Sequence, residues 1–130
     1  MTPESERRPR VVLVEEHDDS RETLALALRL AGFDVEAFAS PTEALAAIEN
    51  ARPDAVVTSI VLPAMRGDDF ARVLRRPAER RPVLVAATGL SDAREEEGEL
   101  FDRVLVKPID IDQLADALRR LLEQNLGERA

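Results

Sequence analysis

Residues 11–16 read VVLVEE, an uninterrupted apolar run that ends in two acids, Glu15 and Glu16. A short continuous apolar run is typical of a strand that is buried on both faces of a parallel sheet. Residues 33–39 alternate apolar and polar side chains, which indicates a second strand nearer the edge of that sheet. Three more strands are predicted at 54–59, 83–87 and 102–106.

Helical patterns fill the intervals between these strands. Three helix starts carry capping signals, at Asp19-x-x-Glu22, Ser40-Pro41-Thr42-Glu43 and Asp110-x-x-Gln113. Another helix is predicted over 68–76, where Pro77 stops it. The fourth helix, expected within 90–100, should be short or irregular, because the run Glu95–Glu97 and the interior Gly98 both weaken a helix.

The alternation of strands and helices predicts the domain organisation. Five βα units favour an α/β fold with a doubly wound parallel sheet, right-handed crossovers and helices on both faces. Residues 1–9 lack a hydrophobic period and are predicted to form a flexible N-terminal tail. We therefore expect one domain over 10–125, followed by a C-terminal tail at 126–130.

Composition narrows the classes of function. A formal charge of −8 disfavours nonspecific binding of nucleic acid, and an aromatic content of 3% supplies little for base stacking. No apolar run reaches bilayer length, no signal peptide is visible and cysteine is absent, so we expect a cytoplasmic protein. The predicted partner is another protein, not a nucleic acid or a membrane.

Polar residues follow the ends of four predicted strands. In a parallel sheet of this kind the functional site forms beyond the carboxyl ends of the strands. That rule brings together Glu15, Glu16, Ser59, Thr88 and Lys107. Lys107 is also the only lysine of the chain, in a sequence that otherwise uses arginine.

These features, in this order, resemble the receiver domain of bacterial two-component response regulators. The resemblance covers about residues 10–122 and depends on the acids after the first strand, the Leu-Pro-x-Met-x-Gly loop at 62–67, Thr88-Gly89 and Lys107-Pro108. It implies a flavodoxin-like sheet with strand order 2-1-3-4-5. It also implies a cis bond between Lys107 and Pro108, an uncommon geometry even before proline.

The family's chemistry is implied by the same resemblance. In a typical receiver the paired acids hold magnesium, an aspartate takes a phosphoryl group from a histidine kinase, and the threonine and lysine contact the phosphate. Ser59 stands at the position of that aspartate. Val104 stands at the position of the family's aromatic switch residue, and Glu15 and Glu16 replace the usual aspartates.

These departures predict a degenerate phosphorylation pocket. A hydroxyl cannot form an acyl phosphate and adds no charge to a metal site. We expect no bound metal or other cofactor, with weak Mg²⁺ binding through Glu15 and Glu16 left open. A deliberate serine substitution would explain Ser59 alone, whereas the accompanying changes at Glu15, Glu16 and Val104 favour natural divergence.

At several residues a purely structural role competes with a functional one. Lys107 is expected to pair with Glu15 or Glu16, since a buried cation needs a partner. His17 is predicted to be an exposed loop residue, and Asp18 and Asp19 to lie in a first helical turn, where the helix dipole favours anions. For Thr88, a signalling role and simple satisfaction of the backbone stay open.

Three functions are weighed. The first is a receiver that is not an enzyme, acts independently of phosphorylation through an unknown signalling protein or kinase, and is a monomer or weak dimer. The second is a receiver phosphorylated at another residue, such as Asp54 or an acid after the first strand. The third is a metal-dependent phosphatase, disfavoured because the third strand offers no nucleophilic carboxylate. The sequence ends soon after the last predicted helix, so we expect the domain to work alone or within a larger assembly.

Overall fold

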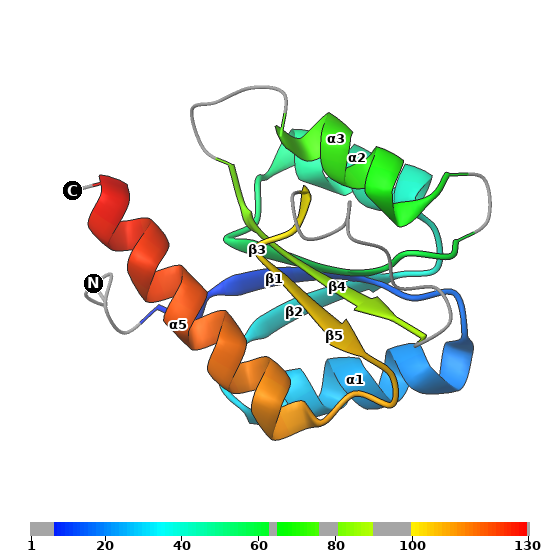
Figure 1. Ribbon diagram of the computed structural model, residues 1–130, viewed down its shortest axis with the longest axis horizontal. Helices are drawn as coiled ribbons and strands as arrows, with labels where there is room; N and C mark the ends of the chain where they lie inside the picture. The colour runs from blue at the N-terminus through cyan, green and yellow to red at the C-terminus, as the bar shows by residue number, and fades with distance from the viewer. Residues whose placement is uncertain (1–6, 63–64, 76–80, 90–99, 130) are drawn as a thin grey trace.

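The computed structural model describes residues 7–62, 65–75, 81–89 and 100–129. It contains one parallel sheet in the order β2-β1-β3-β4-β5, which confirms the predicted flavodoxin-like topology (Figure 1). The elements are β1 (Arg10–Val14), α1 (Asp18–Leu30), β2 (Asp34–Phe38), α2 (Pro41–Asn50), β3 (Ala55–Ser59), α3 (Gly67–Arg75), β4 (Val83–Thr88), β5 (Arg103–Val106) and α5 (Ile111–Arg129).

Helices cover both faces of the sheet and enclose two cores. On one face α1 and α5 pack against the sheet, and Leu28, Leu114 and Leu118 are buried there. On the other face α2 and α3 contribute Ile48, Phe70, Leu74 and their neighbours to a second cluster. The strands β1, β3 and β4 lie inside the sheet and are almost wholly buried, as their continuous apolar runs predicted. No helix within the described residues is long and apolar enough to cross a bilayer.

Two of the predicted helix starts are confirmed and one is wrong. Ser40 caps α2 by accepting a hydrogen bond from the backbone N–H of Glu43, and Asp110 accepts from the backbone of the first turn of α5. The prediction that Asp19 caps α1 is wrong. The helix begins at Asp18, and the residue before it, His17, makes no capping hydrogen bond with its side chain. Asp18 and Asp19 therefore lie inside the first turn, next to the positive end of the helix dipole.

The ends of two other helices differ from the prediction. The helix α3 (Gly67–Arg75) begins one residue before the predicted start, so the glycine of the 62–67 loop is its first residue. Its predicted last residue, 76, lies outside the described residues. The helix α5 continues through Arg129, into the segment expected to be a C-terminal tail, because leucines recur at helical spacing as far as 122 and no proline stops the helix. The predicted fourth helix falls mainly on 90–99, which lies outside the described residues.

Gly67 is required by a close backbone approach beneath the site. Its N–H donates to the carbonyl oxygen of Ile60 at 2.8 Å. A Cβ at this position would lie 2.4 Å from the carbonyl oxygen of Ser59 and 2.7 Å from the Cα of Ile60. The contact fixes the start of α3 against the end of β3, and so positions the residue that ends that strand.

We predict that Gly67→Ala destabilises the protein by about 1–3 kcal/mol, because backbone atoms on both sides must shift to admit the methyl group. Urea unfolding monitored by circular dichroism measures the loss. Gly32→Ala is the comparison variant: no atom lies within 4 Å of its new Cβ, so its cost comes only from the φ of +107°. An unchanged unfolding midpoint for Gly67→Ala would contradict the steric argument.

Candidate functional site

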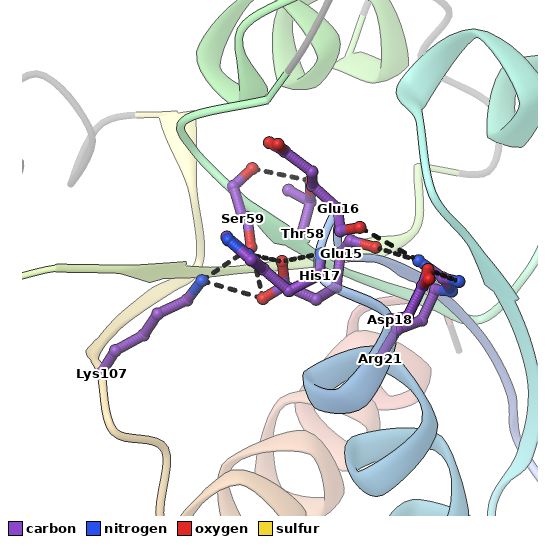
Figure 2. Close-up of polar contacts among 8 residues, drawn as sticks. All are labelled: Glu15, Glu16, His17, Asp18, Arg21, Thr58, Ser59 and Lys107. Atoms are coloured by element: carbon purple, nitrogen blue, oxygen red, sulfur yellow. Dashed lines mark hydrogen bonds and ion pairs between the residues drawn. The ribbon is translucent and has the colours of Figure 1, made fainter.

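The strand-end residues predicted from the sequence meet at the carboxyl edge of the sheet. Glu15 follows β1, Ser59 ends β3, Thr88 ends β4 and Lys107 follows β5. The side chains of Glu15, Ser59 and Lys107 point toward one another (Figure 2). Glu15, Ser59 and Thr88 are buried, whereas Glu16 is exposed. The structure therefore brings the predicted set to one edge but leaves Glu16 on its outer side.

Lys107, Glu15 and Ser59 form a closed triangle of polar contacts. The ammonium of Lys107 donates to Oε1 of Glu15 at 2.8 Å and to Oγ of Ser59 at 3.1 Å. The hydroxyl of Ser59 donates in turn to the same Oε1 at 3.1 Å (Figure 2). The expected pairing of Lys107 is confirmed, with Glu15 as the partner. We call these three residues the strand-end triad.

The second carboxylate oxygen of Glu15 is held by the loop that precedes α1. Oε2 accepts from the backbone N–H of His17 at 3.1 Å and lies 3.4 Å from its Nδ1. The His17 side chain is otherwise 74% exposed, as predicted for a loop residue. Both oxygens of Glu15 are therefore fixed, one by the triad and one by the chain just beyond it.

Arg21 orders the same loop, a role that sequence reasoning missed. Its guanidinium donates to the carbonyl oxygens of Glu15 at 3.0 Å and Glu16 at 3.3 Å, and it pairs with the carboxylate of Asp18 (Figure 2). The spacing of Asp18 and Arg21 on one helix face was the available signal. Arg21 thereby fixes the backbone on which the Glu15 side chain stands.

Burial and hydrogen bonding act in opposite directions on the pKa of Glu15. Desolvation raises the pKa, whereas the hydrogen bond and charge of Lys107, the His17 N–H and the Ser59 hydroxyl lower it. The net result is a pKa below the ordinary value of 4.5. Glu15 is therefore an anion at neutral pH, held beside the Lys107 ammonium.

Thr88 ends β4, and Val104 lies on β5, two residues before its end. The Thr88 hydroxyl donates to the carbonyl of Gly89 at 3.4 Å, and its own carbonyl accepts from the backbone N–H of Lys107 at 2.8 Å. These contacts match the backbone-satisfying interpretation of Thr88. Val104 is half-buried and packs against the cluster that contains the buried Phe101.

The peptide bond between Lys107 and Pro108 is cis, as predicted. Next to it a groove of about 620 Å³ runs between the start of α1 and the β5–α5 connection. Its wall includes Glu15, Asp19, Leu24, Lys107 and Ile109. Within the described residues, no three His, Cys, Asp or Glu side chains converge as they would around a metal ion.

The pKa of Glu15 leads to a prediction for Glu15→Gln. A depressed folded-state pKa adds stability that is complete above 4.5 and is lost as the pH falls through the folded-state pKa. At neutral pH we expect Glu15→Gln to lower the free energy of unfolding by about 1–3 kcal/mol, since a charged hydrogen-bond acceptor is removed.

Urea unfolding of both proteins across a pH series provides the measurement. Other acids titrate in both proteins, so the difference between them isolates Glu15. The difference should be constant above pH 4.5 and shrink below it. A difference that is independent of pH, or that grows in acid, would show that the Glu15 charge does not contribute in this way.

Comparisons with known proteins agree with this geometry. The model of the response regulator receiver domain family matches residues 11–119. The chain is 33% identical over 128 residues to the DNA-binding response regulator MtrA of Mycolicibacterium paratuberculosis, covering 95% of this chain and 55% of the relative. It is 33% identical over 118 residues to the response regulator MprA of Mycobacterium sp. (strain KMS), covering 88% of this chain and 51% of the relative.

A solved structure shows the same likeness in three dimensions. The CheY-like receiver domain from Methylobacillus flagellatus superposes with a TM-score of 0.81 at 34% identity, covering 88% of this chain and 98% of that one. The chain spans about half the length of the curated relatives it matches. The family model, the curated relatives and the solved fold agree, and the chain belongs to the response regulator receiver domain family.

Proposed function

We propose that this chain is a receiver domain that transmits signals without taking a phosphoryl group at Ser59, and that it acts by binding another protein. The observation that carries the proposal is the strand-end triad. At the end of β3, Ser59 is only 4% exposed, and its hydroxyl contacts Glu15 and Lys107. Family membership supports the signalling role, and the residue at this position supports independence from phosphate.

The chemistry of Ser59 sets it apart from an acyl-phosphate acceptor. Acyl phosphate forms on a carboxylate, whereas Ser59 is an alcohol whose hydroxyl donates a hydrogen bond to Glu15. Activation of a serine requires a base free to take the hydroxyl proton. Glu15 is already an anion held by Lys107, and its lowered pKa makes it a poor proton acceptor at neutral pH.

The alternative acceptor Asp54 lies at the opposite edge of the sheet. It precedes β3, and its carboxylate accepts a hydrogen bond from the backbone N–H of Arg10 at 2.8 Å. That contact ties the start of β1 to the start of β3. The position therefore supports a structural role for Asp54 and no contact with the strand-end triad.

Two further observations bear on an enzymatic role. A metal-dependent phosphatase needs several converging metal ligands, and the described residues contain no group of three His, Cys, Asp or Glu that could supply them. The only histidine of the chain lies on the Glu15 side of the triad and is largely exposed. We therefore keep the proposal of a signalling module that is not an enzyme.

A protein partner also suits the charge of the chain. The relative MtrA is named a DNA-binding response regulator, and the present chain aligns with about half of it. A net charge of −8 opposes direct contact between this domain and nucleic-acid phosphates. Monomeric or weakly dimeric behaviour and a cytoplasmic location stay predictions of the sequence.

The direct test is incubation with acetyl phosphate and Mg²⁺, followed by intact-protein mass spectrometry. We expect no phosphoryl adduct on the wild-type chain, because no carboxylate ends β3. Ser59→Asp is the matched variant and should gain a hydroxylamine-sensitive adduct, because it restores an acceptor beside Lys107 and Thr88.

Each other result has a defined meaning. A labile adduct on a carboxylate of the wild-type chain would support relocation of the acceptor, and a stable adduct on Ser59 would contradict the proposal. If neither protein is modified although Ser59→Asp folds, the pocket has changed beyond its acceptor, and the missing aspartate alone does not explain the function.

A further inference from the structure

Magnesium is the cation that the receiver family implies at this site. Magnesium prefers near-octahedral oxygen ligation at short distances, usually with one or two carboxylates. In the strand-end triad the side-chain oxygens are those of Glu15 and the hydroxyl of Ser59. Glu16 is exposed and stands outside the strand-end triad.

The oxygens of Glu15 already have their partners. A carboxylate offers about four lone-pair sites. Oε1 accepts from Lys107 and Ser59, while Oε2 accepts from the His17 N–H and lies 3.4 Å from the His17 ring nitrogen. A metal ion that binds Glu15 would have to compete with these contacts, of which the 2.8 Å bond from the Lys107 ammonium is the shortest.

Charge points the same way. Glu15 and Lys107 neutralise each other, so a dication placed beside them would face a cation at close range. Among the described residues, no second buried carboxylate offsets that repulsion. The Lys107 side chain is 35% exposed and that of Glu15 only 3%. Both border the groove next to α1, so an ion entering there meets Lys107 beside Glu15.

We infer that Lys107 is the resident cation of this site, that its ammonium occupies the place of a divalent metal beside Glu15, and that Ser59 ties this pair to β3. The negative charge of Glu15 in the receiver pocket is thereby neutralised by a side chain of the protein itself. The inference extends the proposed function from the missing acceptor to the missing metal. It rests on the contacts of Glu15 and not on the identity of the acceptor alone.

Thermal unfolding with and without MgCl₂ tests the inference in three proteins: wild type, Lys107→Met and Glu15→Gln/Lys107→Met. Lys107→Met leaves a buried carboxylate without its cation, and we expect it to be the least stable of the three. The double variant removes both charges and should recover part of the lost Tm. Millimolar MgCl₂ should raise the Tm of Lys107→Met by a few degrees, because a cation now binds the folded state preferentially.

The wild-type chain and the double variant should show the same small response to MgCl₂, which reports on surface acids only. The inference is overturned if MgCl₂ stabilises the wild type more than the double variant. It is also overturned if a folded Lys107→Met gains no more from Mg²⁺ than the double variant does.

If Lys107→Met does not fold, Mn²⁺ broadening of amide NMR signals in the wild type and Glu15→Gln decides the question. Equal broadening around Ser59 in both proteins supports the inference, and saturable broadening lost in Glu15→Gln refutes it. No phosphodonor is present in these experiments. Metal binding would therefore overturn this inference alone, whereas an adduct on Ser59 would overturn the proposed function alone.

Discussion

The bond between the Lys107 ammonium and the Glu15 carboxylate joins strand ends that the sheet keeps apart. In the order β2-β1-β3-β4-β5, two strands separate β1 from β5. The Lys107 side chain reaches across the ends of these two strands, and its ammonium lies 2.8 Å from Oε1 of Glu15. Ser59, at the end of β3, contacts both groups. The arrangement needs a parallel sheet, since only there do successive strands end at the same edge.

The fold and most of the site residues could be predicted from the sequence. Continuous apolar runs marked β1, β3 and β4, and the alternation in β2 marked an edge strand, as its place in the sheet confirms. The edge rule placed Glu15, Ser59, Thr88 and Lys107 together. These predictions succeeded because strand burial and parallel topology depend on patterns that a single sequence displays.

Other features depend on geometry that spacing does not fix. The choice of Glu15 over Glu16 as the partner of Lys107 follows from the way the chain leaves β1, with Glu15 turned inward and Glu16 outward. Arg21 orders the loop after β1 by hydrogen bonds to the carbonyl oxygens of Glu15 and Glu16, and sequence spacing does not reveal such contacts. The start of α1 was misplaced because Asp18 and Asp19 both suit a first turn, while His17 precedes them without a capping bond.

The triad also connects the proposed function with the wider family. Receivers resemble one another in fold, and this chain keeps that fold while a serine ends β3. Titration with beryllofluoride and Mg²⁺, followed by amide NMR, tests the central claim most directly because it probes acceptor and metal together. The account predicts that the amide signals of Ser59, Thr88 and Lys107 stay in place at concentrations that saturate Ser59→Asp. Saturable shifts of those signals in the wild-type chain would contradict it.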